Sequence, residues 1–272
     1  MISARRFWGT LAMALACGGT AIFLLLPPAV LLGLGLYYVF GIALVADLSQ
    51  VLAAVAQETD IAPALLATPL IALCVTLLAG IWGLALSLLW RDWLAAGRLS
   101  PLLLTALPLI LPRFVLGALF LLAGLQVAQW GGNILGGGLV ITAQAAVAAP
   151  VVAGLLALGW RRVDPGWYRA AQEAGADEAT IFRRLAWPIL RPYLALGALL
   201  TFFLSFDDFY LANALSGEMP LLSATLFSGI ARSASPLYFA LLALVLLLDI
   251  VLVVLLARLL RPLLPLQKDL VS

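Results

Sequence analysis

Four charged residues lie within long apolar stretches of this sequence, where their chemistry has the largest energetic consequence. Asp207 and Asp208 are adjacent, Arg113 follows a leucine- and proline-rich run, and Asp249 interrupts the last apolar stretch. A charge at the centre of a membrane-spanning helix costs at least ~2.5 kcal/mol, so each should face protein or water rather than lipid. Such residues either form buried ion pairs or meet a solute on its way across the membrane.

Arg113 and Asp249 are candidates for a structural pair because their charges are opposite and their expected depths are similar. The rise per residue of a helix puts Arg113 ~18 Å and Asp249 ~13 Å from the same membrane face. An unpaired charge at such a depth is costly, which favours a buried pair between them. Arg113 is also a candidate for the solute pathway.

Asp207 and Asp208 are the other candidates for the pathway. Adjacent residues on a helix point about 100° apart, so the two carboxylates need not share one site. One is a candidate helix-end cap or headgroup-level charge, and the other a candidate contact for a cationic solute. Nearby hydroxyl and aromatic groups would offer contacts to an alkylammonium or belong to an interfacial belt: Ser205, Phe206, Phe209 and Tyr210.

Several kinds of chemistry are excluded by missing residue types. The chain has no histidine, which excludes a Ser-His-Asp triad and an imidazole metal site. Its only lysine is Lys268, so it has no phosphate-binding loop of the Walker A type, and any ATP must bind to another subunit. The net charge of +2 does not indicate a nucleic-acid-binding protein. Cys17 and Cys74 lie in apolar runs and are expected to be buried rather than paired.

The elements that position these residues are predicted to be membrane-spanning helices. The sequence is 65% hydrophobic with 10% charged residues, and its long uncharged runs indicate an all-α, polytopic membrane protein. A domain over 20–260 is expected to hold six spans, at about 20–41, 64–90, 101–126, 139–159, 193–215 and 237–260. Residues 1–19 are expected to form an interfacial lead-in rather than a cleaved signal peptide, and 261–272 a cytoplasmic tail.

The basic residues choose the orientation of the six-span arrangement. With both termini in the cytoplasm, all of the 15 bases except Arg113 and Arg232 lie on the cytoplasmic side or in the tail. The opposite orientation would invert this bias, which the positive-inside rule disfavours.

The stretch 164–192 is the longest polar interruption in the sequence, and it predicts two short helices around a glycine. Asp164 can cap the first helix, and Pro165 suits its first position. Gly175 fits the left-handed turn that ends a helix, and Asp177 can cap the second one. The plainer alternative is a solvated loop whose basic residues set the topology.

This stretch resembles the EAA loop of ABC importer permeases, whose pattern is Glu-Ala-Ala, three residues, Gly, nine residues, then Ile-x-Leu-Pro. Five positions are in register, namely Ala170, Ala171, Gly175, Leu185 and Pro188. Two positions depart from the pattern, since Arg169 replaces the Glu and Trp187 replaces the Leu. The resemblance continues through Asp207 and Asp208 over roughly 140–260, and it is strongest to the second permease of spermidine/putrescine-type importers.

The resemblance implies a permease subunit of an ATP-driven importer in the bacterial inner membrane. It implies two ABC ATPase subunits, which hold the ATP and magnesium, a second homologous permease and an extracytoplasmic solute-binding protein. No cofactor is expected in this chain, and no enzyme activity. The loop within 160–192 would dock on the ATPase through six residues: Ala170, Ala171, Glu173, Gly175, Ala176 and Asp177. An Asp-Asp pair also occurs in polyamine-type permeases at the place of Asp207 and Asp208.

Other functions stay open at this point. A secondary transporter or channel would use the intramembrane acids as ion sites, but it offers no reason for the EAA-like loop. A membrane enzyme with paired aspartates has no supporting histidine. Within the importer hypothesis, relatives also carry iron, thiamine, phosphonates and other small solutes, and Arg113 would favour an anion unless its charge is neutralised.

Overall fold

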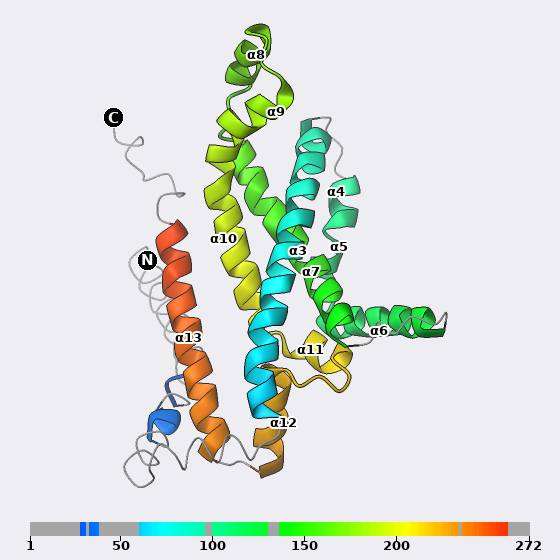
Figure 1. Cartoon of the computed structure of the whole chain (residues 1–272), viewed down its shortest axis with the longest axis vertical. Helices are drawn as coiled ribbons and strands as arrows, with labels where there is room; N and C mark the ends of the chain where they lie inside the picture. Colours follow the sequence, from blue (N-terminus) through cyan, green and yellow to red (C-terminus); the bar gives the residue numbers. More distant parts are fainter. Residues whose placement is uncertain are drawn as a thin grey trace, which may run out of the picture. The chain divides into compact units, whose positions relative to one another are not determined.

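The computed structural model describes residues 28–30, 33–37, 60–95, 100–129, 136–233 and 236–260, which are helices joined by short connections (Figure 1). The chain divides into two compact units, one of residues 59–225 and 251–272 and the other of residues 1–58 and 226–250. Four helical segments in the described part are long and apolar enough to cross a membrane, namely 61–93, 137–160, 178–206 and 237–260. This agrees with the expected polytopic helical membrane protein. The presence of six spans and the orientation of the termini stay predictions. The first expected span, 20–41, lies largely outside the described residues.

Helix α7 (Gly137–Trp160) is the central helix of the larger unit. Of the most apolar 18-residue stretch of α7, 67% is buried inside the protein. The corresponding share is 28% for α3 (Ile61–Ala95) and 39% for the segment that contains α10 (Trp187–Phe206). Both α3 and α10 pack along α7 and against each other. The sequence of α7 is rich in alanine and glycine, and small side chains let neighbouring membrane helices approach closely.

The expected third span, 101–126, is not one helix. It is divided into α4 (Ser100–Thr105), α5 (Leu107–Ile110) and α6 (Arg113–Gln129). Leu111 is extended (φ −68°, ψ 137°) because the ring of Pro112 disfavours a helical conformation for the preceding residue. The chain changes direction there, and α6 runs across the line of α5 (Figure 1). Arg113 therefore stands at the start of a new helix and not in the middle of a span.

The expected fifth span, 193–215, is also interrupted. Helix α10 ends at Phe206, and α11 (Phe209–Leu215) begins after the two residues Asp207 and Asp208. Asp208 is extended (φ −74°, ψ 94°), and its side chain accepts a hydrogen bond from the Leu211 backbone amide, as a helix N-cap does. The two aspartates thus form the corner between two helices, and α11 packs against α6.

The polar stretch forms α8 (Pro165–Glu173) and α9 (Glu178–Ile181), which continues through a π-helical turn, η1 (Phe182–Ala186), into α10. The two predicted helices around Gly175 are confirmed. Pro188 and Pro192 do not interrupt the chain, because both lie within the first turns of α10. The second helix of the hairpin and α10 are therefore one continuous helical segment, 178–206, which is a candidate membrane span.

The chain continues through α12 (Leu222–Ser233) into α13 (Pro236–Leu260), and residues 226–250 of these helices belong to the smaller unit. Asp249 lies in α13 and is partly buried. The expected lead-in at 1–19 and the tail at 261–272 fall outside the described residues and stay predictions.

Candidate functional site

The first candidate site is the hairpin made by α8, Gly175 and α9. At its start, the Asp164 carboxylate accepts a hydrogen bond of 2.7 Å from the Gly166 amide, while Pro165 takes the first helical position. This confirms the predicted cap. The cap satisfies one of the amides that a helix start leaves without an intrahelical partner.

The turn of the hairpin requires a glycine for its backbone conformation. Gly175 has a φ of +82°, in the left-handed region that side chains disfavour. Its amide bonds to the Gln172 carbonyl at 2.9 Å, and the Ala176 amide bonds to the Ala171 carbonyl at 3.0 Å, which closes the end of α8. A Cβ at Gly175 would meet no atom within 4 Å, so the requirement is conformational and not steric.

Most of the hairpin surface is free of contacts with the described part of the chain. Helix α8 buries none of its residues, and its Trp167 is 56% exposed. Of the six expected docking residues, Ala171 and Ala176 are half-buried and the others exposed: Ala170, Glu173, Gly175 and Asp177. The Thr180 hydroxyl beside Asp177 lowers the pKa of that carboxyl below its ordinary value, so it is charged at neutral pH. Their docking role stays a prediction.

The base of the hairpin is anchored in a tight apolar cluster. Ile181 is buried, and the ring of Phe182 lies between those of Trp160 and Trp187, with centroid distances of 6.3 and 6.2 Å. Buried residues of α7, η1 and α10 complete the cluster: Val152, Leu156, Ala186, Leu190 and Tyr193. Because close-packed side chains transmit displacement, a force on the hairpin reaches both α7 and α10.

The second candidate site is the corner at Asp208. Arg113 Nη1 donates to Asp208 Oδ2 at 2.6 Å, and the Leu211 amide donates to Asp208 Oδ1 at 3.1 Å. The Asp208 side chain is 3% exposed and the Arg113 side chain 36%. Both carboxylate oxygens are thus engaged, and the ion pair fastens the start of α11 to the start of α6.

A polar seam continues from this corner into the helix packing. Ser205 of α10 donates to the amide oxygen of Gln144 in α7 at 2.6 Å, and both residues are buried. A cavity of about 10 Å³ lies among Arg113, Gln144, Thr201, Ser205 and Asp208. This volume matches a single water molecule. The Thr201 hydroxyl is buried with no hydrogen-bond partner in the described part of the chain, so it suits a bound water.

The structure separates the two adjacent aspartates that the sequence left equivalent. Asp207 is exposed, and its carboxylate forms no ion pair or hydrogen bond with the described residues, whereas Asp208 is buried and paired. Arg113 forms its ion pair with Asp208. The sequence had instead suggested Asp249 as its partner. Asp249 belongs to the other unit, and its pairing with Arg113 stays a prediction.

Sequence reasoning missed Gln144 and Thr201, and it also missed Arg91, whose guanidinium lies 5.0 Å from the Trp160 ring centroid. A signal for Gln144 was present, since a glutamine in a run of alanine and valine has to find a partner when buried. No local signal identified Ser205 as that partner, because 61 residues separate the two.

Comparison with solved structures identifies the fold. The chain superposes on a chain of a bacterial alginate ABC transporter, solved with an alginate pentasaccharide-bound periplasmic protein, with a TM-score of 0.69 and 15% identity over 96% of each chain. A chain of an ABC transporter for import of the acidic polysaccharide alginate gives a TM-score of 0.65 and 14% identity, over 94% of this chain and 97% of that one. This chain therefore shares its fold with chains of bacterial ABC transporters.

Sequence comparison adds a more particular similarity. The chain is 28% identical over 139 residues to the spermidine/putrescine transport system permease protein PotC of Haemophilus influenzae, which is 51% of each chain. It is 28% identical over 148 residues to PotC of Escherichia coli K12, covering 54% of this chain and 53% of the relative. The match therefore spans about half the length of these relatives. No family model matches the chain. The resemblance to polyamine-type permeases is confirmed.

Proposed function

We propose that this chain is the permease subunit of an ATP-driven importer. The observation that carries the proposal is the exposed hairpin α8–Gly175–α9, which buries none of α8 and continues without a break into α10. A rigid helical segment transmits displacement better than a flexible loop. A partner that moves the hairpin therefore moves a candidate membrane span, and no nucleotide needs to bind to this chain.

The proposed assembly follows from that coupling. Two ATPase subunits bind ATP and magnesium. The hairpin docks on an ATPase subunit through the six residues 170, 171, 173 and 175–177. A second homologous permease completes the pathway, and a solute-binding protein delivers the solute from outside. The assembly lies in the bacterial inner membrane with the hairpin in the cytoplasm. The similarity to PotC and the ABC transporter fold support these partners.

A cationic solute of the polyamine kind is the proposed cargo. Arg113 would repel a cation, but Asp208 neutralises it at 2.6 Å. The exposed Asp207 then supplies a negative charge at this corner. Tyr210 is 61% exposed and its ring lies 5.6 Å from that of Phe209, so aromatic faces are at hand for cation–π contacts with an ammonium group.

The test is uptake of labelled putrescine and spermidine into vesicles that hold the complete importer, with and without ATP. We expect uptake that requires ATP, and a loss of most of it in Asp207→Asn with unchanged thermal stability, because Asp207 has no structural partner in the described chain. Asp208→Asn serves as the comparison, since it should lower stability as well as uptake.

The alternative outcomes separate the hypotheses. Uptake that follows an ion gradient and ignores ATP would reject the importer in favour of a secondary transporter. ATPase activity stimulated by the binding protein without polyamine uptake would keep the importer and reject the polyamine. Unchanged uptake in Asp207→Asn would remove that residue from the pathway.

A further inference from the structure

A pocket of about 450 Å³ lies where α3 and α7 end, and neither candidate site uses it. It is lined by Arg91 of α3 and by the last turn of α7 with the residue that follows: Ala157, Leu158, Trp160 and Arg161. Both helices are candidate membrane spans, and they end near this pocket at Trp93 and Trp160. Tryptophan concentrates at the membrane–water interface, so the pocket lies at the level of the lipid headgroups.

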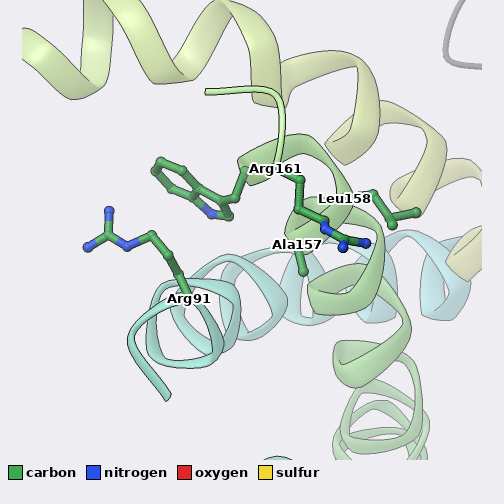
Figure 2. Close-up of a pocket in the computed structure, with 5 residues that line it drawn as sticks. Arg91, Ala157, Leu158 and Arg161 are labelled. Carbon is green, nitrogen blue, oxygen red and sulfur yellow. The ribbon is translucent and has the colours of Figure 1, made fainter. Parts of the chain in front are cut away.

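The pocket is lined by two arginines and otherwise by apolar side chains. In Figure 2, Arg91 extends from α3 and Arg161 from the end of α7, and their guanidinium groups lie on opposite sides of the view. Leu158 is 51% exposed, and the Arg91 guanidinium packs 5.0 Å from the Trp160 ring centroid. Asp92 bonds to Arg91 Nε at 2.9 Å, while Arg161 forms no ion pair within the described residues. The local charge is therefore positive.

We propose that this pocket binds the headgroup phosphate of an anionic phospholipid. The two guanidinium groups match the charge, and arginine is well suited to phosphate because its donors form a planar fork. The exposed Leu158 and the half-buried Ala157 offer an apolar surface to the first carbons of an acyl chain. The volume falls within the roughly 300–1,000 Å³ of small-molecule pockets and exceeds what a lone phosphate needs.

Because of where the pocket lies, a bound lipid would affect the coupling between ATP hydrolysis and transport. A second pocket of about 460 Å³ shares Arg91 and Trp160 and reaches the hairpin through Tyr168, Arg169 and Glu178. Arg161 is the first residue of the connection from α7 to α8. A bound lipid thus holds the junction between a membrane span and the hairpin, and it raises ATPase-coupled transport. The proposal that a lipid binds here depends only on the helical membrane fold. Only the proposed effect of the lipid on coupling rests on the proposed function.

The experiment measures which lipid stays on the purified, assembled importer by native mass spectrometry after exchange into mixed phosphatidylglycerol and phosphatidylcholine. We expect retention of phosphatidylglycerol, reduced about fivefold by Arg91→Gln or by Arg161→Gln, in keeping with the contribution of one basic side chain near an anionic lipid surface. Arg258→Gln is the matched control, because it removes the same charge near the end of α13 without lining this pocket. It should leave retention unchanged.

Several outcomes would overturn the proposal. Equal retention of phosphatidylcholine, or an equal loss in Arg258→Gln, would reduce the effect to general surface charge. Displacement of the lipid by millimolar inorganic phosphate would identify a free anion as the ligand. Efficient cross-linking of Arg91→Cys to another subunit would show that protein covers the pocket. If Arg91→Gln folds poorly, retention of phosphatidylglycerol by Arg161→Gln tests the proposal by itself. ATP-dependent uptake that persists without selective lipid retention rejects this inference and leaves the proposed function intact.

Discussion

At the scale of single residues, Asp208 differs from its neighbour because both of its carboxylate oxygens have partners. One accepts from Arg113 and the other caps α11 through the Leu211 amide. A carboxylate with 3% exposure that is already paired offers no free oxygen to a passing ammonium group. Asp208 therefore holds the corner in place, and Asp207 is the one of the two aspartates that we propose contacts the solute.

The ion pair predicts an asymmetry between the two single variants. Arg113→Gln leaves a buried carboxylate without its counter-charge, which costs ~3 kcal/mol of unfolding free energy by comparison with broken buried pairs. Asp208→Asn leaves only a guanidinium that is 36% exposed, and its amide oxygen can still accept from Leu211, so it should cost ~1 kcal/mol, as an exposed pair does. Thermal denaturation in detergent measures both.

The double variant Arg113→Gln/Asp208→Asn completes this comparison. It leaves no unpaired charge and retains two groups able to hydrogen-bond, so it should be more stable than Arg113→Gln alone. Additive losses in the double variant would show that the two side chains do not interact energetically. Asp207→Asn, with its exposed side chain, should leave the unfolding temperature unchanged.

At the scale of elements, the crossing of α3 and α7 depends on the absence of a side chain at Gly83. A Cβ there would lie 2.6 Å from Val152 Cβ and 3.0 Å from the Ala149 carbonyl oxygen. Gly83→Ala should therefore force the helices apart and cost ~1–3 kcal/mol, as overpacked cores do. Thermal stability of the purified protein is the measurement.

The same helix contains a matched control for that change. A Cβ at Gly80 would meet nothing within 4 Å, so Gly80→Ala should leave stability unchanged or raise it slightly through helix propensity. Val152→Gly should partly rescue Gly83→Ala, because it removes both side-chain atoms that clash, Cβ and Cγ1. Equal effects of the two glycine variants would contradict the close approach at Gly83.

The hairpin gives a second prediction at this scale. Gly175→Val should insert into the membrane normally but lose most ATPase coupling, because a β-branched residue at a φ of +82° costs ~1–3 kcal/mol and disrupts the turn. Asn tolerates this region better, so Gly175→Asn should retain more activity. The readout is ATPase activity stimulated by the solute-binding protein, alongside uptake.

A second glycine controls for backbone strain in general. Gly217, between α11 and α12, has a φ of +60° and equally open surroundings. Gly217→Val introduces comparable strain away from the hairpin and should leave coupling largely intact. Normal coupled transport by Gly175→Val would reject the hairpin as the transmitting element.

At the scale of the whole molecule, cysteine labelling tests the proposed orientation of the chain in the membrane. In a chain whose Cys17 and Cys74 are replaced by alanine, Glu173→Cys should react with a membrane-impermeant reagent only from the cytoplasmic side. Glu218→Cys should react only from outside. Both native side chains are exposed, so accessibility depends on the membrane and not on burial. The reverse pattern would invert the proposed orientation.

The sequence alone determined those features that arise within a few residues. The cap at Asp164, the left-handed turn at Gly175 and the helices on either side of it were predicted because caps and turns are made by neighbouring backbone and side-chain groups. The all-helical membrane class followed equally from the long apolar runs, since a bilayer requires every backbone group to be satisfied within its segment.

Only the tertiary structure decided how the charges and polar groups are shared. Arg113 and Asp208 are 95 residues apart, and they meet because the chain turns at Pro112 and again at the two aspartates. The sequence-based prediction treated 101–126 and 193–215 as uninterrupted spans. It placed Arg113 within one span and Asp208 near the end of another, and it foresaw no contact between them. Pairing between distant segments depends on how helices pack, and packing is a property of all the surrounding side chains together.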